Sequence, residues 1–277
     1  RTAFYPSSGG QPFDTGTIAG IGVVDVLDEE DHVIHVLGSP LDPECHHVSG
    51  SVDAGRRLDH MRQHTGQHAL SAVLEEEFGL KTVSFHMGAG YSTIDVEPQG
   101  VNAAKLLEIE KRVNERLFEN LPVSVAFEHS GTVAGLRKAP DREGLLRVVT
   151  IAGLDRSARG GTHVARTGEV GMILLGKTEK VRQSLRLEFF CGERVLHEVR
   201  SRLSDTELQA AALRERLADS DKARKRLSSE VAEIAGQQRY VQSSADSSDR
   251  RSWIEEMEVV DEDTRMRANA FLTNENA

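Results

Sequence analysis

The segment 198–241 constrains the fold of this chain more than any other. It contains no proline and no glycine before Gly236, and single apolar residues are spread among dense charges. These apolar residues are Leu203, Leu208, Leu213, Leu217, Leu227, Val231 and Ile234. The pattern predicts a long, exposed helix of the coiled-coil kind, through which a homodimer could form. We therefore assign residues 201–277 to a C-terminal region, in which the serine-rich residues 243–248 are expected to be a polar linker.

Residues 1–55 show a different pattern. Short runs such as 20–27 and 32–37 alternate apolar and polar residues, which is typical of half-buried strands. We predict a small N-terminal β domain that is barrel-like and carries a glycine-rich loop near its start.

Residues 56–200 combine helices with strands. Apolar residues recur at helical spacing in 56–78 and 101–120, and Gly79 is expected to end the first helix. Strands are expected at 82–86 and 92–96, which would form a hairpin, and at 123–128, 145–151, 172–178 and 183–190. The predicted fold class is α+β: the N-terminal β domain, an α/β sandwich with helices on one sheet face, and the long C-terminal helix.

Composition narrows the possible functions. The net charge of −10 argues against a broadly basic nucleic-acid surface, although a local basic stripe remains compatible with it. No apolar run is long enough to span a bilayer, so no membrane partner is expected. The two cysteines, Cys45 and Cys191, fit a reducing cytoplasm. ATP binding is not expected because there is no Walker loop, and a G-x-S-x-G elbow and an H-E-x-x-H motif are absent too.

Three histidines suggest a metal site. His64 and His68 lie four residues apart in the first predicted helix, so both imidazoles project from one face. At that spacing two neutral imidazoles can bind one divalent ion, of which zinc is the best match. His163 follows a glycine pair that permits a tight turn. Three nitrogens and a water would form an open, catalytic type of zinc site, whereas ordinary histidines without metal are the plainer alternative in a chain with eleven of them.

Colinear motifs carry a resemblance to a known family. They are His64-Thr-Gly-Gln-His68, Ser84-Phe-His-Met-Gly88, Ser92-Thr-Ile-Asp95 and the glycine-rich residues 160–171, preceded by the glycine-rich residues 2–16. Over residues 1 to about 200 the chain resembles the AlaX trans-editing proteins, free-standing relatives of the editing domain of alanyl-tRNA synthetase. The resemblance implies a zinc-dependent aminoacyl-tRNA deacylase that hydrolyses alanine-specific tRNA mischarged with serine or glycine. Residues 253–276 resemble the start of the DHH-associated domain of longer AlaX proteins.

One position departs from the family pattern. In the family, zinc is held by the two helix histidines and by the Cys and His of a Cys-Gly-Gly-Thr-His stretch. His64, His68 and His163 match, but Arg159 stands in place of the cysteine, and arginine cannot ligate zinc. Two outcomes stay open: zinc held by three histidines and a water, or an empty site in which Arg159 supplies the positive charge.

The resemblance also implies a pocket beside the metal. Ser84 and His86 alternate along one strand and would point to the same side. Ser84 could hydrogen-bond the hydroxyl of a misattached serine, which alanine lacks, and His86 could orient water or the terminal ribose. Gln67 would lie at the pocket rim. A serine bonded to backbone and a packed histidine are the simpler alternatives.

Further residues are expected around this pocket. Gly9, Gly10 and Gln11, together with Thr162, are expected to bind the acceptor end of the tRNA substrate. Asp95 is expected either to orient a ligating imidazole or to lie in solvent at a strand end.

Two rival interpretations remain. Arg159 favours a non-catalytic tRNA-binding or oligomerising paralogue with a degenerate metal site. A fragment of alanyl-tRNA synthetase is the other. Because the chain begins with arginine inside what resembles a motif, further sequence is expected at both ends.

Overall fold

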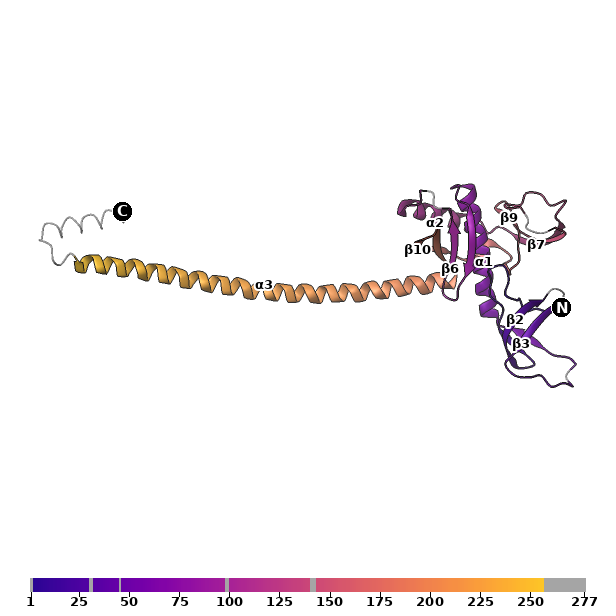
Figure 1. Cartoon of the computed structure of the whole chain (residues 1–277), viewed down its shortest axis with the longest axis horizontal. Coiled ribbons are helices and arrows are strands. Elements are labelled where there is room, and N and C mark those ends of the chain that lie inside the picture. The colour runs from indigo at the N-terminus through magenta and orange to yellow at the C-terminus, as the bar shows by residue number, and fades with distance from the viewer. Residues whose placement is uncertain (1, 30–31, 45, 98–99, 140–142, 257–277) are drawn as a thin grey trace. The chain divides into compact units, whose positions relative to one another are not determined.

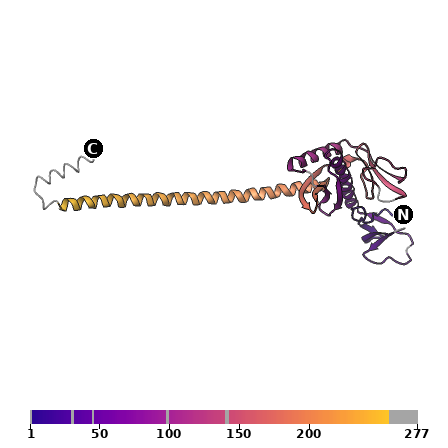
Figure 2. The ribbon, with the colours of Figure 1, turned by 45° about the horizontal axis from the view of Figure 1, so that its top comes forward.

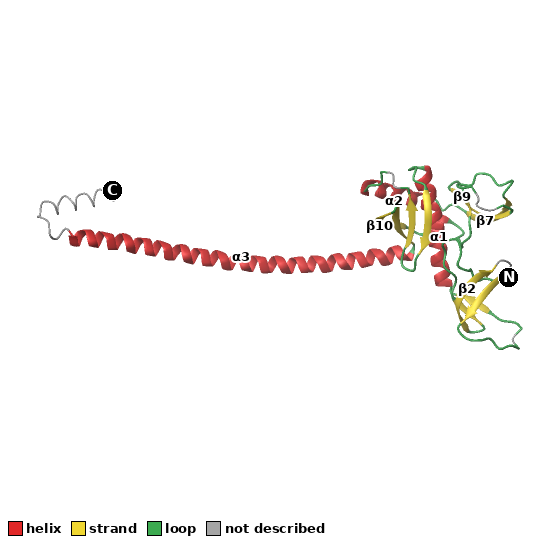
Figure 3. Cartoon of the chain, in the orientation of Figure 1, coloured by secondary structure: helices red, strands yellow, loops and turns green. Residues whose placement is uncertain are grey.

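The structure is a computed structural model that describes residues 2–29, 32–44, 46–97, 100–139 and 143–256. The chain separates into two compact units, residues 1–203 and 204–277 (Figure 1). The first unit mixes strands with helices, as Figure 3 shows by colour. The α+β class is therefore confirmed, whereas the proposed boundary between residues 55 and 56 stays a prediction.

The N-terminal strands form one antiparallel sheet. β1 (Gly16–Ile18), β2 (Ile21–Glu29), β3 (His32–Leu37) and β4 (Gly50–Val52) are arranged in the order β3-β2-β1-β4. A small core of Phe4, Ile18, Val23 and Val26 lies against it. Among the residues that the structure describes, β3 and β4 do not pair with each other, so the barrel-like closure is not confirmed. Four strands, two of them only three residues long, are too few to close a barrel.

The main sheet carries α1 (Ala54–Glu76) and α2 (Ala103–Phe118) on one face. β5 (Thr82–Met87), β6 (Ser92–Val96), β10 (Ile173–Val181) and β11 (Ser184–Cys191) form an antiparallel sheet in the order β10-β11-β6-β5. α1 and α2 contact each other and this sheet, and the largest buried cluster lies between them. The predicted sandwich and its hairpin are confirmed.

α1 begins and ends where local chemistry requires. The Asp53 side chain accepts a hydrogen bond from the backbone N–H of Arg56, which caps the helix N-terminus. Gly79 has a φ of +67°, and the N–H of Leu80 donates to the Leu74 carbonyl. The expected glycine stop is confirmed, and the buried Leu80 turns the chain into β5.

A third sheet lies on the other side of α1. β7 (Val123–His129), β8 (Leu145–Ile151) and β9 (Asp155–Ala158) are antiparallel in the order β7-β8-β9. Figures 1 and 2 show α1 between this sheet and the main one. β9 was not predicted, because its four residues have no apolar alternation. A short 3₁₀ turn, η1 (Thr167–Val170), follows it.

The C-terminal helix is longer than predicted. α3 (Glu193–Glu256) includes residues 243–248, so the expected polar linker is wrong. Serine and aspartate cost only tenths of a kcal/mol each in a helix, and no proline interrupts the run. The apolar residues between Leu203 and Ile234 are exposed. The expected DHH-associated segment, residues 253–276, lies mostly outside the described residues. In the part of the chain that is described, no helix is both long and apolar enough to span a membrane.

Candidate metal centre and pocket

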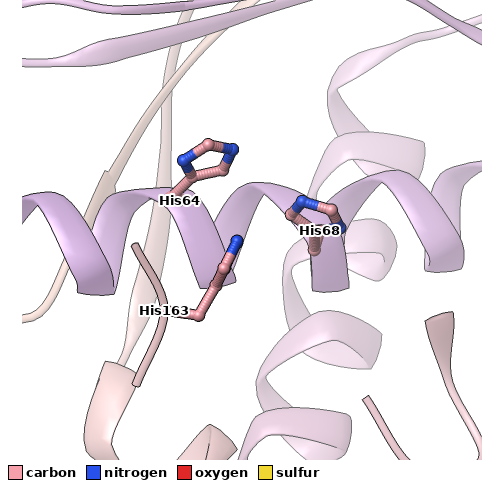
Figure 4. A group of neighbouring side chains, drawn as sticks. All are labelled: His64, His68 and His163. Carbon is pink, nitrogen blue, oxygen red and sulfur yellow. The ribbon is translucent and has the colours of Figure 1, made fainter. Parts of the chain in front are cut away.

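α1 and a loop bring three histidines together. His64 and His68 are buried on one face of α1, and His163 comes from the loop between β9 and η1 (Figure 4). The ring centroid of His163 lies 4.7 Å from that of His64 and 5.0 Å from that of His68. One ring nitrogen from each residue lies within 4.8 Å of the others. The three histidines are therefore close enough to bind one metal ion.

Asp155 holds the ring of His68. Its Oδ2 accepts a hydrogen bond from His68 Nδ1 at 2.6 Å, and its Oδ1 accepts one from Arg137 Nε at 2.7 Å. Burial raises the pKa of Asp155, but the His68 hydrogen bond and the Arg137 charge outweigh it, so the pKa lies below its ordinary value. Because Nδ1 donates, Nε2 carries the lone pair. That Nε2 is buried and has no partner among the described residues, as expected of a metal-ligating atom.

Gln11 holds the ring of His64 in the same way. Its Oε1 accepts from the Thr162 N–H at 2.9 Å and lies 3.0 Å from His64 Nδ1. Its own amide donates to Thr162 Oγ1 at 2.9 Å. The Gln11 oxygen is an acceptor, so His64 donates from Nδ1 and presents Nε2 as its ligand atom. The glycine-rich loop thus sets the tautomer of a metal-site histidine.

Burial keeps the imidazoles of His64 and His163 neutral. It lowers the pKa of His64 well below the usual value, with further lowering from His163 and His68. It also lowers the pKa of His163 to about 3. Thr65 Oγ1 lies 3.3 Å from His163 Nδ1, and the Gly160 carbonyl lies 3.3 Å from its Nε2. Neutral imidazoles are the form that binds metal.

Gly161 allows the loop to reach the helix. Its φ is +90°, and a Cβ there would lie 2.1 Å from the His64 ring. The Gly161 N–H donates to Tyr5 Oη at 2.6 Å, and Arg147 donates to the Gly161 carbonyl at 2.9 Å. Only glycine fits this position, because any other amino acid would be strained at this φ and its Cβ would clash with the His64 ring.

A pocket of about 310 Å³ opens beside the histidines. Of the residues expected there from the sequence, it is lined by Gly9, Gly10, Gln67 and Ser84. Gln11 and Thr162 lie behind His64 and bond to each other. His86 is exposed on β5 and does not line the pocket. Arg159, which the sequence placed at the metal site, also lines it, together with Arg137 and Lys138, which were not expected there.

The expectation for Asp95 is wrong in both of its forms. Asp95 accepts from Ser84 Oγ at 2.7 Å and from Arg186 Nε at 2.7 Å. The Arg186 hydrogen bond holds the pKa of Asp95 below its ordinary value. Asp95 therefore neither orients an imidazole nor lies free in solvent. Asp155 has the orienting role, and no sequence signal marked it because it opens a strand that was not predicted.

Comparison with known proteins agrees with this geometry. Residues 146–187, which contain His163, match the second additional domain of threonyl- and alanyl-tRNA synthetases. This match places His163 in a segment similar to a domain of threonyl- and alanyl-tRNA synthetases.

Several curated proteins are similar to this chain over most of its length. The mouse alanyl-tRNA editing protein Aarsd1 is 39% identical over 201 residues, covering 70% of this chain and 48% of the relative. The editing protein AlaX-L of Pyrococcus horikoshii is 35% identical over 222 residues, covering 74% and 53%. The alanine–tRNA ligase of Korarchaeum cryptofilum is 34% identical over 208 residues, covering 69% and 23%. The chain is similar to AlaX-type alanyl-tRNA editing proteins over 70% or more of its own length, and it spans about half the length of the editing proteins it matches.

Proposed function

We propose that this protein hydrolyses the ester bond of alanine-specific tRNA that carries serine or glycine, as an aminoacyl-tRNA deacylase acting in trans. One observation carries the proposal: His64, His68 and His163 converge beside a pocket, and the buried Nε2 of His68 has no partner in the described residues. The similarity to alanyl-tRNA editing proteins supports the substrate class. The pocket volume of about 310 Å³ is at the low end for small-ligand sites, which suits a small aminoacyl group.

The proposal includes one zinc ion per chain, held by the three histidines and a water. Three converging imidazoles, two of them oriented by Asp155 and Gln11, fit such an ion. When bound, zinc would polarise the ester carbonyl and lower the pKa of a bound water.

The protein's own groups would bind the substrate. Ser84 does not supply the expected acceptor for a serine hydroxyl, because its Oγ donates to Asp95 on β6 while the ring of the neighbouring Phe85 lies 5.4 Å from that of His64. Successive residues of a strand point to opposite faces, so the Ser84 side chain projects away from the histidines. The side-chain amide of Gln67 donates to Ser71 Oγ at 2.7 Å, and this hydrogen bond fixes the orientation of the amide. The Gln67 carbonyl oxygen would then accept a hydrogen bond from the α-amino group of the substrate's amino acid. Gly9 and Gly10 would let the tRNA end approach the backbone.

A non-catalytic tRNA-binding protein is the second candidate. Arg159 favours it, since this cation lines the pocket where the family has a ligand. Together with Arg137 and Lys138 it makes the described lining basic, which attracts phosphate and repels a divalent ion.

Single-turnover deacylation of alanine tRNA charged with serine tests both candidates. We expect the parent to release serine and His68→Ala to lose at least 100-fold in rate, on the order expected for a lost metal. His86→Ala, outside the pocket, serves as the matched control and should keep the parent rate. Tight tRNA binding by a parent that releases no serine would support the second candidate.

Homodimerisation through α3 is also part of the proposal. Seven residues, all exposed except the half-buried Ala210, share the two apolar positions of one heptad register: Leu203, Ala210, Leu217 and Val231 in one, and Leu213, Leu227 and Ile234 in the other. A second copy of the helix would cover this seam. We place the activity in the cytoplasm, where tRNA is charged.

A further inference from the structure

Three side chains form a row across the third sheet. Phe127 on β7 is paired with Arg147 on β8. The N–H of Arg159, the residue after β9, donates to the Arg147 carbonyl at 3.1 Å and continues the pairing of β8 with β9. Residues directly opposite one another on neighbouring strands project from the same face. The row therefore runs from the outer strand to the lip of the histidine pocket.

A groove of about 610 Å³ follows this row. Phe127, Arg147 and Arg159 all line it. It shares Gly9 and Arg159 with the histidine pocket, so the two hollows adjoin at these residues. A ligand lying in the groove would have one end beside His64 and His68.

The row leaves an aromatic ring and a guanidinium group exposed to a ligand. Phe127 is 66% exposed, although large aromatic side chains normally gain from burial. Arg147 is held in place by hydrogen bonds to the carbonyls of Arg159 and Gly161, both at 2.9 Å. Arg159 is exposed, and its guanidinium makes no hydrogen bond or ion pair with the described part of the chain. Glu143 is the acidic residue of this lining.

We propose that this row binds the single-stranded 3′ end of tRNA, an inference that rests on the proposed function. An exposed aromatic ring is a platform on which a base stacks, and a free guanidinium binds phosphate. Phe127 stacks against a base upstream of the terminal nucleotide. Arg159 contacts the phosphate of the terminal nucleotide, whose aminoacyl group then enters the histidine pocket. Arg159 is thereby a positioning residue, which accounts for a cation at the position where the family has a zinc ligand.

Binding of two uncharged tRNAs tests the row independently of hydrolysis. One is an intact alanine tRNA, and the other lacks the single-stranded 3′ nucleotides. We expect the whole chain to bind the intact tRNA about tenfold more tightly. Phe127→Ala and Arg159→Ala should abolish most of that difference, and Phe127→Trp should keep it because tryptophan also stacks.

Two controls lie elsewhere on the surface. Arg156→Ala removes a cation from the opposite face of the same strand, where it pairs with Glu128, and Tyr91→Ala removes another exposed aromatic ring. Both should keep the preference for the intact end. Circular dichroism would verify that each variant is folded.

The outcomes separate this inference from the proposed function. If the parent distinguishes the two tRNAs through Phe127 and Arg159 but releases no serine, the proposed binding of the tRNA end by this row stands and the proposed hydrolase activity is wrong. If the parent releases serine, and Phe127→Ala and Arg159→Ala keep both its preference for the intact tRNA and its KM, the proposed binding by this row is wrong and the proposed hydrolase activity stands. In an active parent we expect both variants to raise KM at least fivefold with little change in kcat.

Discussion

Oδ2 of Asp155 lies 2.6 Å from Nδ1 of His68, so a carboxylate at the start of β9 orients an imidazole on α1. The same carboxylate binds Arg137 and Ser157, and its side chain is fully buried. Such a contact fixes both the tautomer and the angle of the ring. It makes Asp155 as much a part of the candidate metal site as the histidines.

Asp155→Asn should weaken zinc binding tenfold to a hundredfold, because an amide cannot match the carboxylate as an acceptor for His68. Competition with a chromophoric chelator measures this affinity. Glu128→Gln is a suitable control, since it breaks an ion pair with Arg156 in the same sheet without contacting the histidines. Equal zinc affinity in the parent and in Asp155→Asn would show that the contact serves only the fold.

Arg159→Cys should raise the zinc affinity, because a thiolate replaces a cation where the family has its fourth ligand. Arg159→Ala removes the charge without adding a ligand and separates the two effects. Mass spectrometry of the purified proteins gives the metal content. About one zinc per chain in the parent would show that three histidines suffice, whereas a metal-free parent beside a zinc-filled cysteine variant would show that the site has lost its metal.

Gly161→Ala should strongly reduce both metal binding and deacylation. The new Cβ would lie 2.1 Å from the His64 ring, and the φ of +90° is unfavourable for alanine, at a cost of about 1–3 kcal/mol. Gly153→Ala is the matched control, because Gly153 has a φ of +67° but nothing within 4 Å of its added Cβ. If both variants lose activity equally, the close approach to His64 is not the cause.

Acid should destabilise the metal-free protein. Burial, aided by the charge of Arg56, lowers the pKa of His60 to about 4, and burial lowers that of His163 to about 3. Between these values and about 6.5 the unfolded chain binds more protons than the folded one, so the free energy of unfolding falls as pH falls through this window. Urea unfolding at pH 7 and pH 5 should show a loss on the order of 1 kcal/mol or more.

His60→Gln removes one of these titrating groups and should flatten the pH dependence. His86→Gln, which changes an exposed histidine, should leave the dependence as it is. The same slope in all three proteins would exclude His60 as a source of the effect.

Leu213→Glu should dissociate a dimer formed through α3, because Leu213 lies on the heptad seam and is 61% exposed in the single chain. Leu208→Glu is the control: it has similar exposure, 67%, but lies off the seam. Sedimentation equilibrium gives the mass of each. A monomeric parent would rule out the dimer.

The larger elements were predictable because their signals are local. The apolar spacing of α1 and α2, the hairpin of β5 and β6 and the charged run of α3 each follow from residues within one segment. The short strands β1, β4 and β9 have too few residues to show a period, and the helical continuation through residues 243–248 contradicts a composition that is usually a linker.

The candidate site divides along the same line. The sequence by itself determined that His64 and His68 share a helix face and that an arginine, Arg159, stands four residues before His163, where the family resemblance implies a cysteine, since both depend only on position along the chain. Only the tertiary structure decided that Asp155 rather than Asp95 orients an imidazole, that Gln11 reaches His64, and that Phe127 and Arg159 line one groove. Those pairings join segments far apart in the chain, and which segments meet is decided by how the sheets and α1 bury their apolar faces, not by any local pattern.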